Sequence, residues 1–175
     1  DRLFHAGSFS LAALTTFTLS GQPSFASRLP GADYSGLEIF AEVNAAIAAS
    51  AVTLTAGYTK EDGTTSGRST VVTASLASLT TRRLVPLPLA AGDKGVSRLD
   101  SLTVGGAAAA SGSVNIVIAR RLWSNRVRLA NDGGLDDLGA TGMPVVYDTS
   151  ALWLVVEADS TASGVPELMM TIPNG

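Results

Sequence analysis

The sequence contains no cysteine, one histidine and few charged or aromatic residues. Without cysteine the chain has no disulfide, no thiolate nucleophile and no cysteine-based zinc site. Only 15% of the 175 residues are charged, against about a quarter in an ordinary soluble domain. The net charge of −3 argues against broad nucleic-acid binding, and no apolar run reaches the roughly 18 residues of a membrane span. The shortage of charge predicts a surface that is partly covered by other subunits.

What the sequence does have is an alternation of apolar and polar residues at a period of two. Residues Leu37–Asn44 and Val52–Tyr58 alternate in this way, as half-buried strands do. An Asp-Gly turn signal at Asp62 predicts a hairpin that returns along Arg68–Ala74. Further strands are expected at Ser8–Ser20, Arg83–Leu89, Val96–Val104, Val114–Trp123, Leu152–Ala158 and Glu167–Ile172. Eight or nine short strands without a long helix predict an all-β fold, an antiparallel β-sandwich of the jelly-roll kind.

The domain organisation follows from the Pro- and Gly-bearing connection that precedes Gly36. Residues 31–175 are expected to form the sandwich, and residues 1–30 an N-terminal strand or arm. The arm could reach a neighbouring subunit, or the segment Ser8–Ser20 could be the first strand of its own sandwich. Pro86 and Pro88 predict that their strand lies at an edge or is irregular. The expected core residues are Ile39, Val43, Leu54, Ile116, Ile118, Leu154 and Val156.

The sequence contains few residues that could support catalysis. His5 is the single histidine, and no Gly-x-Ser-x-Gly elbow accompanies it. Glu38 and Glu42 lie on one strand face about 13 Å apart, beyond the roughly 5–9.5 Å of a glycosidase carboxylate pair. A carboxylate from a neighbouring strand stays open as a partner for either. The sequence predicts that the chain is not an enzyme.

One acidic loop has the composition of a cation site. Asp132, Asp136 and Asp137 lie in a stretch that also contains Asn131 and two glycines, but their spacing does not match an EF-hand. A plain turn is the simpler interpretation. The stretch 63–68 resembles a phosphate loop only in composition, because the closing Gly-Lys-Ser/Thr is missing. We therefore expect no cofactor and no metal, with calcium at the acidic loop as the alternative.

The charge that the chain does carry is concentrated after the apolar run 114–118. Ten of the twelve basic residues are arginine, the cation preferred in protein interfaces. Four of these arginines surround one tryptophan, which would also suit nucleic-acid contact. The acidic loop that follows favours ion pairs within or between subunits instead. The candidate interface is Arg120, Arg121, Trp123, Arg126, Arg128, Glu38 and Glu42.

Several stretches together resemble a family of structural proteins of tailed bacteriophages. They are Leu29–Gly31 with Tyr34–Glu38, Gly57–Thr64 with Gly67–Thr70, Leu84–Leu89 with Ala91–Val96, and Ala119–Leu122. The most specific parts are the Tyr-Thr-x-x-Asp-Gly hairpin and the Pro-Leu-x-Leu-x-x-Gly-Asp-x-Gly-Val turn. The chain is most similar to capsid decoration (cement) proteins, over about residues 29–157.

The resemblance implies a non-enzymatic virion component on the capsid surface, with no catalytic residues. Its expected partners are the major capsid protein and copies of itself, as a homo-oligomer and specifically a trimer, with neither nucleic acid nor membrane. The alternative is a carbohydrate-binding β-sandwich module of a tail or fibre component. A sugar platform needs exposed aromatic rings, and the chain has only ten aromatic residues. A hydrolase on a β-scaffold is disfavoured by the single histidine.

Overall fold

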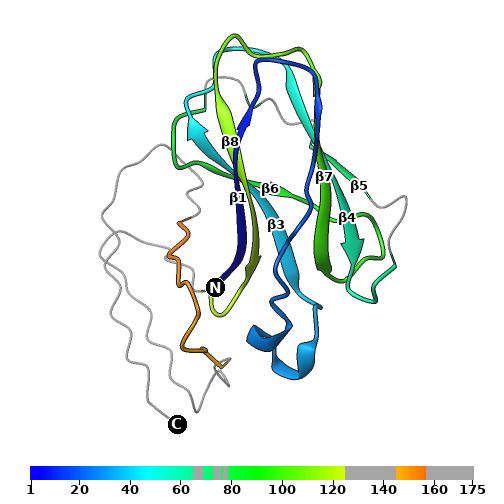
Figure 1. Ribbon diagram of the computed structural model, residues 1–175. Helices are drawn as coiled ribbons and strands as arrows, with labels where there is room; N and C mark the ends of the chain where they lie inside the picture. The colour runs from blue at the N-terminus through cyan, green and yellow to red at the C-terminus, as the bar shows by residue number, and fades with distance from the viewer. Residues whose placement is uncertain (65–68, 73–75, 77–78, 125–144, 157–175) are drawn as a thin grey trace.

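A computed structural model describes residues 1–64, 69–72, 76, 79–124 and 145–156 (Figure 1). Their regular structure is almost entirely β. The strands are β1 (Arg2–Ser10), β2 (Thr16–Thr18), β3 (Leu37–Ala45), β4 (Val52–Lys60), β5 (Ser69–Val72), β6 (Leu84–Leu87), β7 (Val96–Gly106) and β8 (Ser113–Arg120). Two short 3-10 helices, η1 (Ala26–Arg28) and η2 (Pro30–Ala32), lie between β2 and β3. No helix in the described part of the chain has the length and apolar character needed to cross a bilayer.

The strands form two four-stranded antiparallel sheets, in the orders β1-β8-β3-β6 and β2-β7-β4-β5. The first strand therefore pairs with the eighth, the second with the seventh, the third with the sixth and the fourth with the fifth. This is the pattern of one long antiparallel hairpin folded over on itself, which is a jelly roll. Two further pairings, β3 with β8 and β4 with β7, join these pairs into the sheets. The all-β sandwich expected from the sequence is confirmed.

The alternation of side chains in β3 and β4 builds the core between the sheets. In β3 every second residue, namely Leu37, Ile39, Ala41 and Val43, is buried, while the residues between them, Glu38, Phe40 and Glu42, are partly exposed. Val52, Leu54 and Ala56 of β4 do the same from the opposite sheet. Because successive side chains in a strand point to opposite faces, each strand contributes every second residue to the core. Of the core residues expected from the sequence, Ile39, Val43, Leu54, Ile116 and Ile118 are at most 1% exposed.

The edge strand β6 follows the sequence prediction. It pairs only with β3 among the described strands, and it lies at the end of its sheet. Pro86 stands opposite Phe40 in this pairing. Proline lacks the N–H that a further neighbour would require, so it is tolerated at this position.

Four strand predictions need correction or lie outside the described residues. Residues 152–156 are not a strand, and Leu154 and Val156 are 53% and 61% exposed, so both are wrong as core residues. No described strand lies beside them to complete a ladder. The single strand expected at Ser8–Ser20 is instead the end of β1, a bend and the three-residue β2. The expected strand Val114–Trp123 ends at Arg120. The segments Glu167–Ile172 and Asp132–Asp137 lie outside the described residues.

Candidate interface at the ends of β1 and β8

A buried charge cluster joins the start of β1 to the end of β8. The nitrogen of Asp1 donates to the carbonyl of Arg120 at 2.8 Å, and the Arg120 N–H donates back to the Asp1 carbonyl at 2.8 Å. The side chain of Asp1 has no exposed surface; its carboxylate accepts a hydrogen bond from Arg28 and lies 3.6 Å from Nη2 of Arg120. Two guanidinium groups thus surround one carboxylate, and all three groups are largely shielded from water.

The burial of the two arginines is energetically unfavourable in itself. The pKa of the Arg120 guanidinium is lowered, mainly by burial and further by the positive charge of Arg28, although Tyr147 acts in the opposite direction. Nε of Arg28 and both Nε and Nη1 of Arg120 are buried without a hydrogen-bond partner. A buried charge is tolerated when it is paired, and removing its partner is strongly destabilising. The cluster therefore fixes the geometry of the residues around it.

The cluster also holds residues 145–156, which we call the strap. Ser150 Oγ and the Ala151 N–H donate to the Asp1 carboxylate at 3.2 and 3.1 Å. Nη2 of Arg120 donates to the carbonyl of Val145 at 2.8 Å, and its guanidinium lies over the ring of Tyr147. Figure 1 shows the strap, in orange, beside the N-terminus and the sheet that contains β1 and β8.

The outer part of the strap exposes an unusual amount of apolar surface. The exposed fractions are 39% for Leu152, 53% for Leu154, 45% for Val155 and 61% for Val156. Only Trp153 of this run is partly covered, with the Arg2 guanidinium 5.4 Å from its ring centroid. Single exposed apolar residues are common, but a contiguous group of them marks an interaction surface. The strap is the strongest candidate interface in the described chain.

The candidate residues named from the sequence separate into two groups in space. Arg120 is buried in the cluster, whereas Arg121, the next residue, is exposed and bonds Glu38 through Nη2 at 3.0 and 3.4 Å. Trp123 is 38% exposed. Arg126, Arg128 and the acidic loop residues Asp132, Asp136 and Asp137 lie outside the described residues. The sequence grouped these arginines by proximity along the chain, but adjacent residues face opposite directions.

Glu42, the other candidate glutamate, belongs to a polar group on the outer face of the same sheet. Asn115 Nδ2 donates to Glu42 Oε2 at 3.1 Å, and Nε2 of His5 lies 3.6 Å from the same oxygen. His5 thus sits in β1 opposite Val117 and not in a loose terminal segment. Among the described residues, no second carboxylate pairs with Glu38 or Glu42. No group of three metal-ligating side chains occurs in the described part of the chain.

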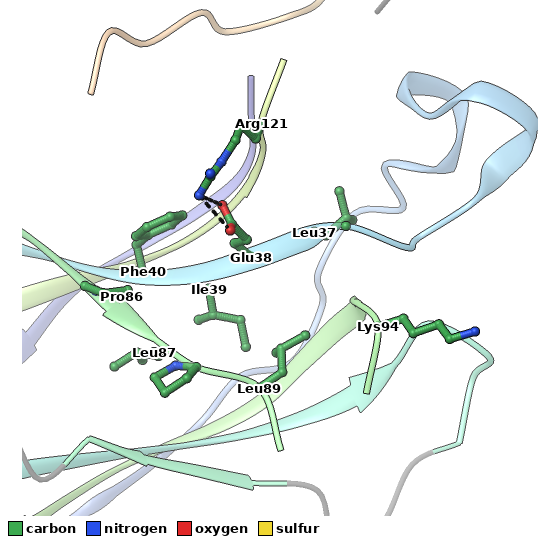
Figure 2. A pocket seen from close by; sticks show the side chains of 11 residues that line it. Leu37, Glu38, Ile39, Phe40, Pro86, Leu87, Leu89, Lys94 and Arg121 are labelled. Atoms are coloured by element: carbon green, nitrogen blue, oxygen red, sulfur yellow. Dashed lines mark hydrogen bonds and ion pairs between the residues drawn. The ribbon is translucent and has the colours of Figure 1, made fainter. Parts of the chain in front are cut away.

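A shallow groove lies at the opposite edge of this sheet, between β3 and β6 (Figure 2). Its volume is about 390 Å³. Phe40 and Pro86, which are paired across the two strands, lie at the left in Figure 2, and the Glu38–Arg121 ion pair stands above them at the rim. Lys94 lines the groove at the right of the view. Apolar side chains make up most of the lining, and the charged side chains of Glu38, Arg121 and Lys94 lie among them.

The residues that organise the candidate interface, Asp1 and Arg28, carry no recognisable signal in the sequence. Asp1 and Arg28 are 27 positions apart, and Asp1 and Ser150 are 149 apart. No motif links such distant residues, because they come from the start of β1, from η1 and from the strap, and only the folded chain brings these together. The exposed strap carried a signal, a run of five apolar residues, but that signal equally describes a buried strand.

In comparisons with protein-family models, with curated proteins and with solved structures, no match to the chain was found. The fold and the surface of the molecule therefore carry the functional proposal.

Proposed function

We propose that the chain is a non-enzymatic structural protein of a tailed-bacteriophage virion. In this role it coats and stabilises the capsid shell by contacting copies of itself and the major capsid protein. The exposed apolar strap on a jelly-roll domain is the observation that carries the proposal. Jelly rolls are a common architecture of viral capsid domains, although they also occur in lectins, and fold alone does not define function.

The surface of the domain supports assembly in preference to catalysis. Low overall charge, an exposed apolar strap and a groove with an apolar lining suit a protein that is surrounded by other subunits. Interfaces of obligate assemblies resemble a domain core in their apolar character. The resemblance of the hairpin 57–64 and the turn 84–96 to decoration proteins adds the capsid as the place of assembly.

The carbohydrate-binding alternative depends on exposed aromatic rings. All ten aromatic residues lie in the described part of the chain, and only Trp123 is exposed. Phe25 and Tyr58 are buried, and Phe4, Phe9, Phe17 and Tyr34 pack against the core. A single exposed ring beside arginines gives little stacking area for a sugar, so the virion role is the better supported function.

The proposal is tested by locating the chain on intact particles. Antibodies raised against the purified chain are applied to particles from the culture that produces it, and gold-labelled secondary antibody is imaged by electron microscopy. Labels distributed over the head are expected. Labels on the tail or its fibres would favour the alternative, and particles without label would overturn the virion role.

A further inference from the structure

The four edge strands of the two sheets are not equally protected against pairing with another strand. The sheet orders place β1 and β6 at the edges of one sheet, and β2 and β5 at the edges of the other. β2 has three residues, β5 has four, and β6 has four including Pro86. β1 has nine residues with neither proline nor lysine, and register shifts interrupt its pairing with β8 between Arg2 and Phe4 and between Ala6 and Phe9. Short edges and edge prolines oppose strand addition, as bulges do, so among the edges of the described sheets β1 offers the longest stretch for it.

The outer side of β1 already begins to pair with the strap. Asp1 exchanges its backbone hydrogen bonds with Arg120, so the alternation of the ladder turns Arg2 away from β8. The Arg2 N–H donates to the Ala151 carbonyl at 2.8 Å, while Arg28 donates to the Arg2 carbonyl at 3.0 Å. From Phe4 to Phe9, no backbone hydrogen bond joins the outer side of β1 to another described residue.

The strap presents a segment with the character of a strand that has no neighbour. After Ala151, residues 152–156 are Leu-Trp-Leu-Val-Val, and no backbone hydrogen bond joins them to another described residue. A continuous run of apolar and β-branched residues is typical of a strand covered on both faces. Here the run is held at Ala151 by Arg2 and Asp1, and it is exposed beyond that point.

We propose that residues 152–156 of one copy add as a strand to the outer edge of β1 in a second copy of this chain. Within the described residues, each copy carries both an apolar segment without a strand partner and an edge strand, so reciprocal exchange satisfies both and closes the assembly. The occupant is a second copy because the same chain supplies both the edge and the exposed segment that would pair with it. The partly buried Phe4 and Phe9 of β1 would gain cover from the added strand.

Charge is compatible with this exchange. The segment 150–156 contains no charged residue, and β1 contains only Arg2 and His5. Arg2 already contacts the strap of its own subunit through its N–H and its guanidinium. No like charges would therefore be brought together when the segment meets the edge between Phe4 and Phe9.

This inference rests on the self-association that the proposed function includes, but not on the capsid as its place. The first test compares two leucines of similar exposure, Leu154 at 53% and Leu14 at 58%. Leu154→Lys should weaken self-association at least about tenfold, because lysine opposes burial in the new strand pair. Leu14→Lys, in the connection between β1 and β2, should leave self-association unchanged. Dissociation constants come from sedimentation velocity, and melting curves check that both variants are folded.

The second test uses the absence of native cysteine. Ala6→Cys, in β1, and Leu154→Cys are made in separate chains that differ in size, then mixed and oxidised. A disulfide between the two chains is expected, and Ala91→Cys in place of Ala6→Cys should give none. The double variant in one chain tests whether the segment closes onto its own edge.

The outcomes separate this inference from the proposed function. A bond within one chain only, equal effects of the two lysine variants, or a monomer at all concentrations would each overturn the exchange. Self-association without a bond between Ala6→Cys and Leu154→Cys would also overturn it and leave the virion role standing. A mixed-chain bond together with particles that carry no label would uphold the exchange and reject the virion role.

Discussion

Strand β8 and the strap contain similar apolar runs, yet only the first is buried. Val114, Ile116, Val117 and Ile118 of β8 have no exposed surface. Leu152, Leu154, Val155 and Val156 of the strap are 39–61% exposed. Both segments are rich in β-branched residues, so intrinsic strand preference does not separate them.

The difference lies in their neighbours. β8 pairs along its length with β1 on one side and β3 on the other, and the second sheet covers its inner face. The strap is attached at Ala151 and by the side chains around Asp1, with no ladder beyond that point. An apolar run becomes core when strands on both sides satisfy its backbone, because burying unpaired N–H and C=O groups is unfavourable.

The largest expected effect comes from removing β1, which lies between the two segments. Deletion of residues 1–22 takes away the partner of β8 together with the buried Leu3 and Leu11. We expect an insoluble or molten chain, seen as loss of the cooperative melting transition and gain of dye binding to exposed apolar surface. The same deletion would also remove the anchor of the strap.

The deletion decides between the two interpretations of the N-terminal residues 1–30. In the structure β1 pairs with β8 of its own chain. A folded, monomeric deletion product would show that the domain does not need this strand, and the N-terminal segment would then act as an arm between subunits. That outcome would also contradict the explanation that β8 is buried because strands pair on both of its sides, because β8 would be stable without one of them.

A smaller effect is expected from single truncations in the two runs. Ile116→Ala should lower the free energy of unfolding by about 2–5 kcal/mol, because it leaves a cavity at a fully buried site. Leu154→Ala should change it by less than about 0.5 kcal/mol, as an exposed site does. Urea denaturation at low protein concentration measures both.

The stability losses of the two truncations should depend differently on protein concentration. If the strap is covered by a second copy, the cost of Leu154→Ala should grow as the concentration rises, because association stabilises the folded state. The cost of Ile116→Ala should stay the same. A loss below half of one kcal/mol for Ile116→Ala would remove this residue from the core.

The sequence was most informative where polar and apolar residues alternate. The spacing in β3 and β4 identified both strands and which side chains they bury, and turn signals gave the hairpin between β4 and β5. The run 152–156 does not alternate, so its period could not tell a buried strand from an unpaired one. Arg121 and Glu38 were expected in an interface, but their ion pair, like the cluster around Asp1, depends on which strands are neighbours.

The smallest expected effect is a pH dependence in the hairpin that follows β4. A hydrogen bond from the Lys60 side chain and another from the Thr64 N–H lower the pKa of Asp62 from 3.8 to about 2. Because the folded state holds the charged form, the native chain binds fewer protons than the unfolded chain in this range. The stabilisation is therefore complete above the unfolded pKa of about 3.8 and is lost as the pH falls through about 2.

Asp62→Asn should be less stable than the parent chain at neutral pH, and the difference should shrink as the pH falls through about 2 and vanish below it, where both side chains are neutral. The same pair of measurements in a Leu154→Ala background tests whether the strap belongs to the unit that unfolds with the jelly roll. Distant and independent sites give additive effects, so the Asp62→Asn difference should be identical in the two backgrounds at every pH. A difference that changes with Leu154→Ala would show that the strap is coupled to the hairpin in the opposite sheet. The strap would then be energetically part of the jelly roll and not an independent, unpaired segment.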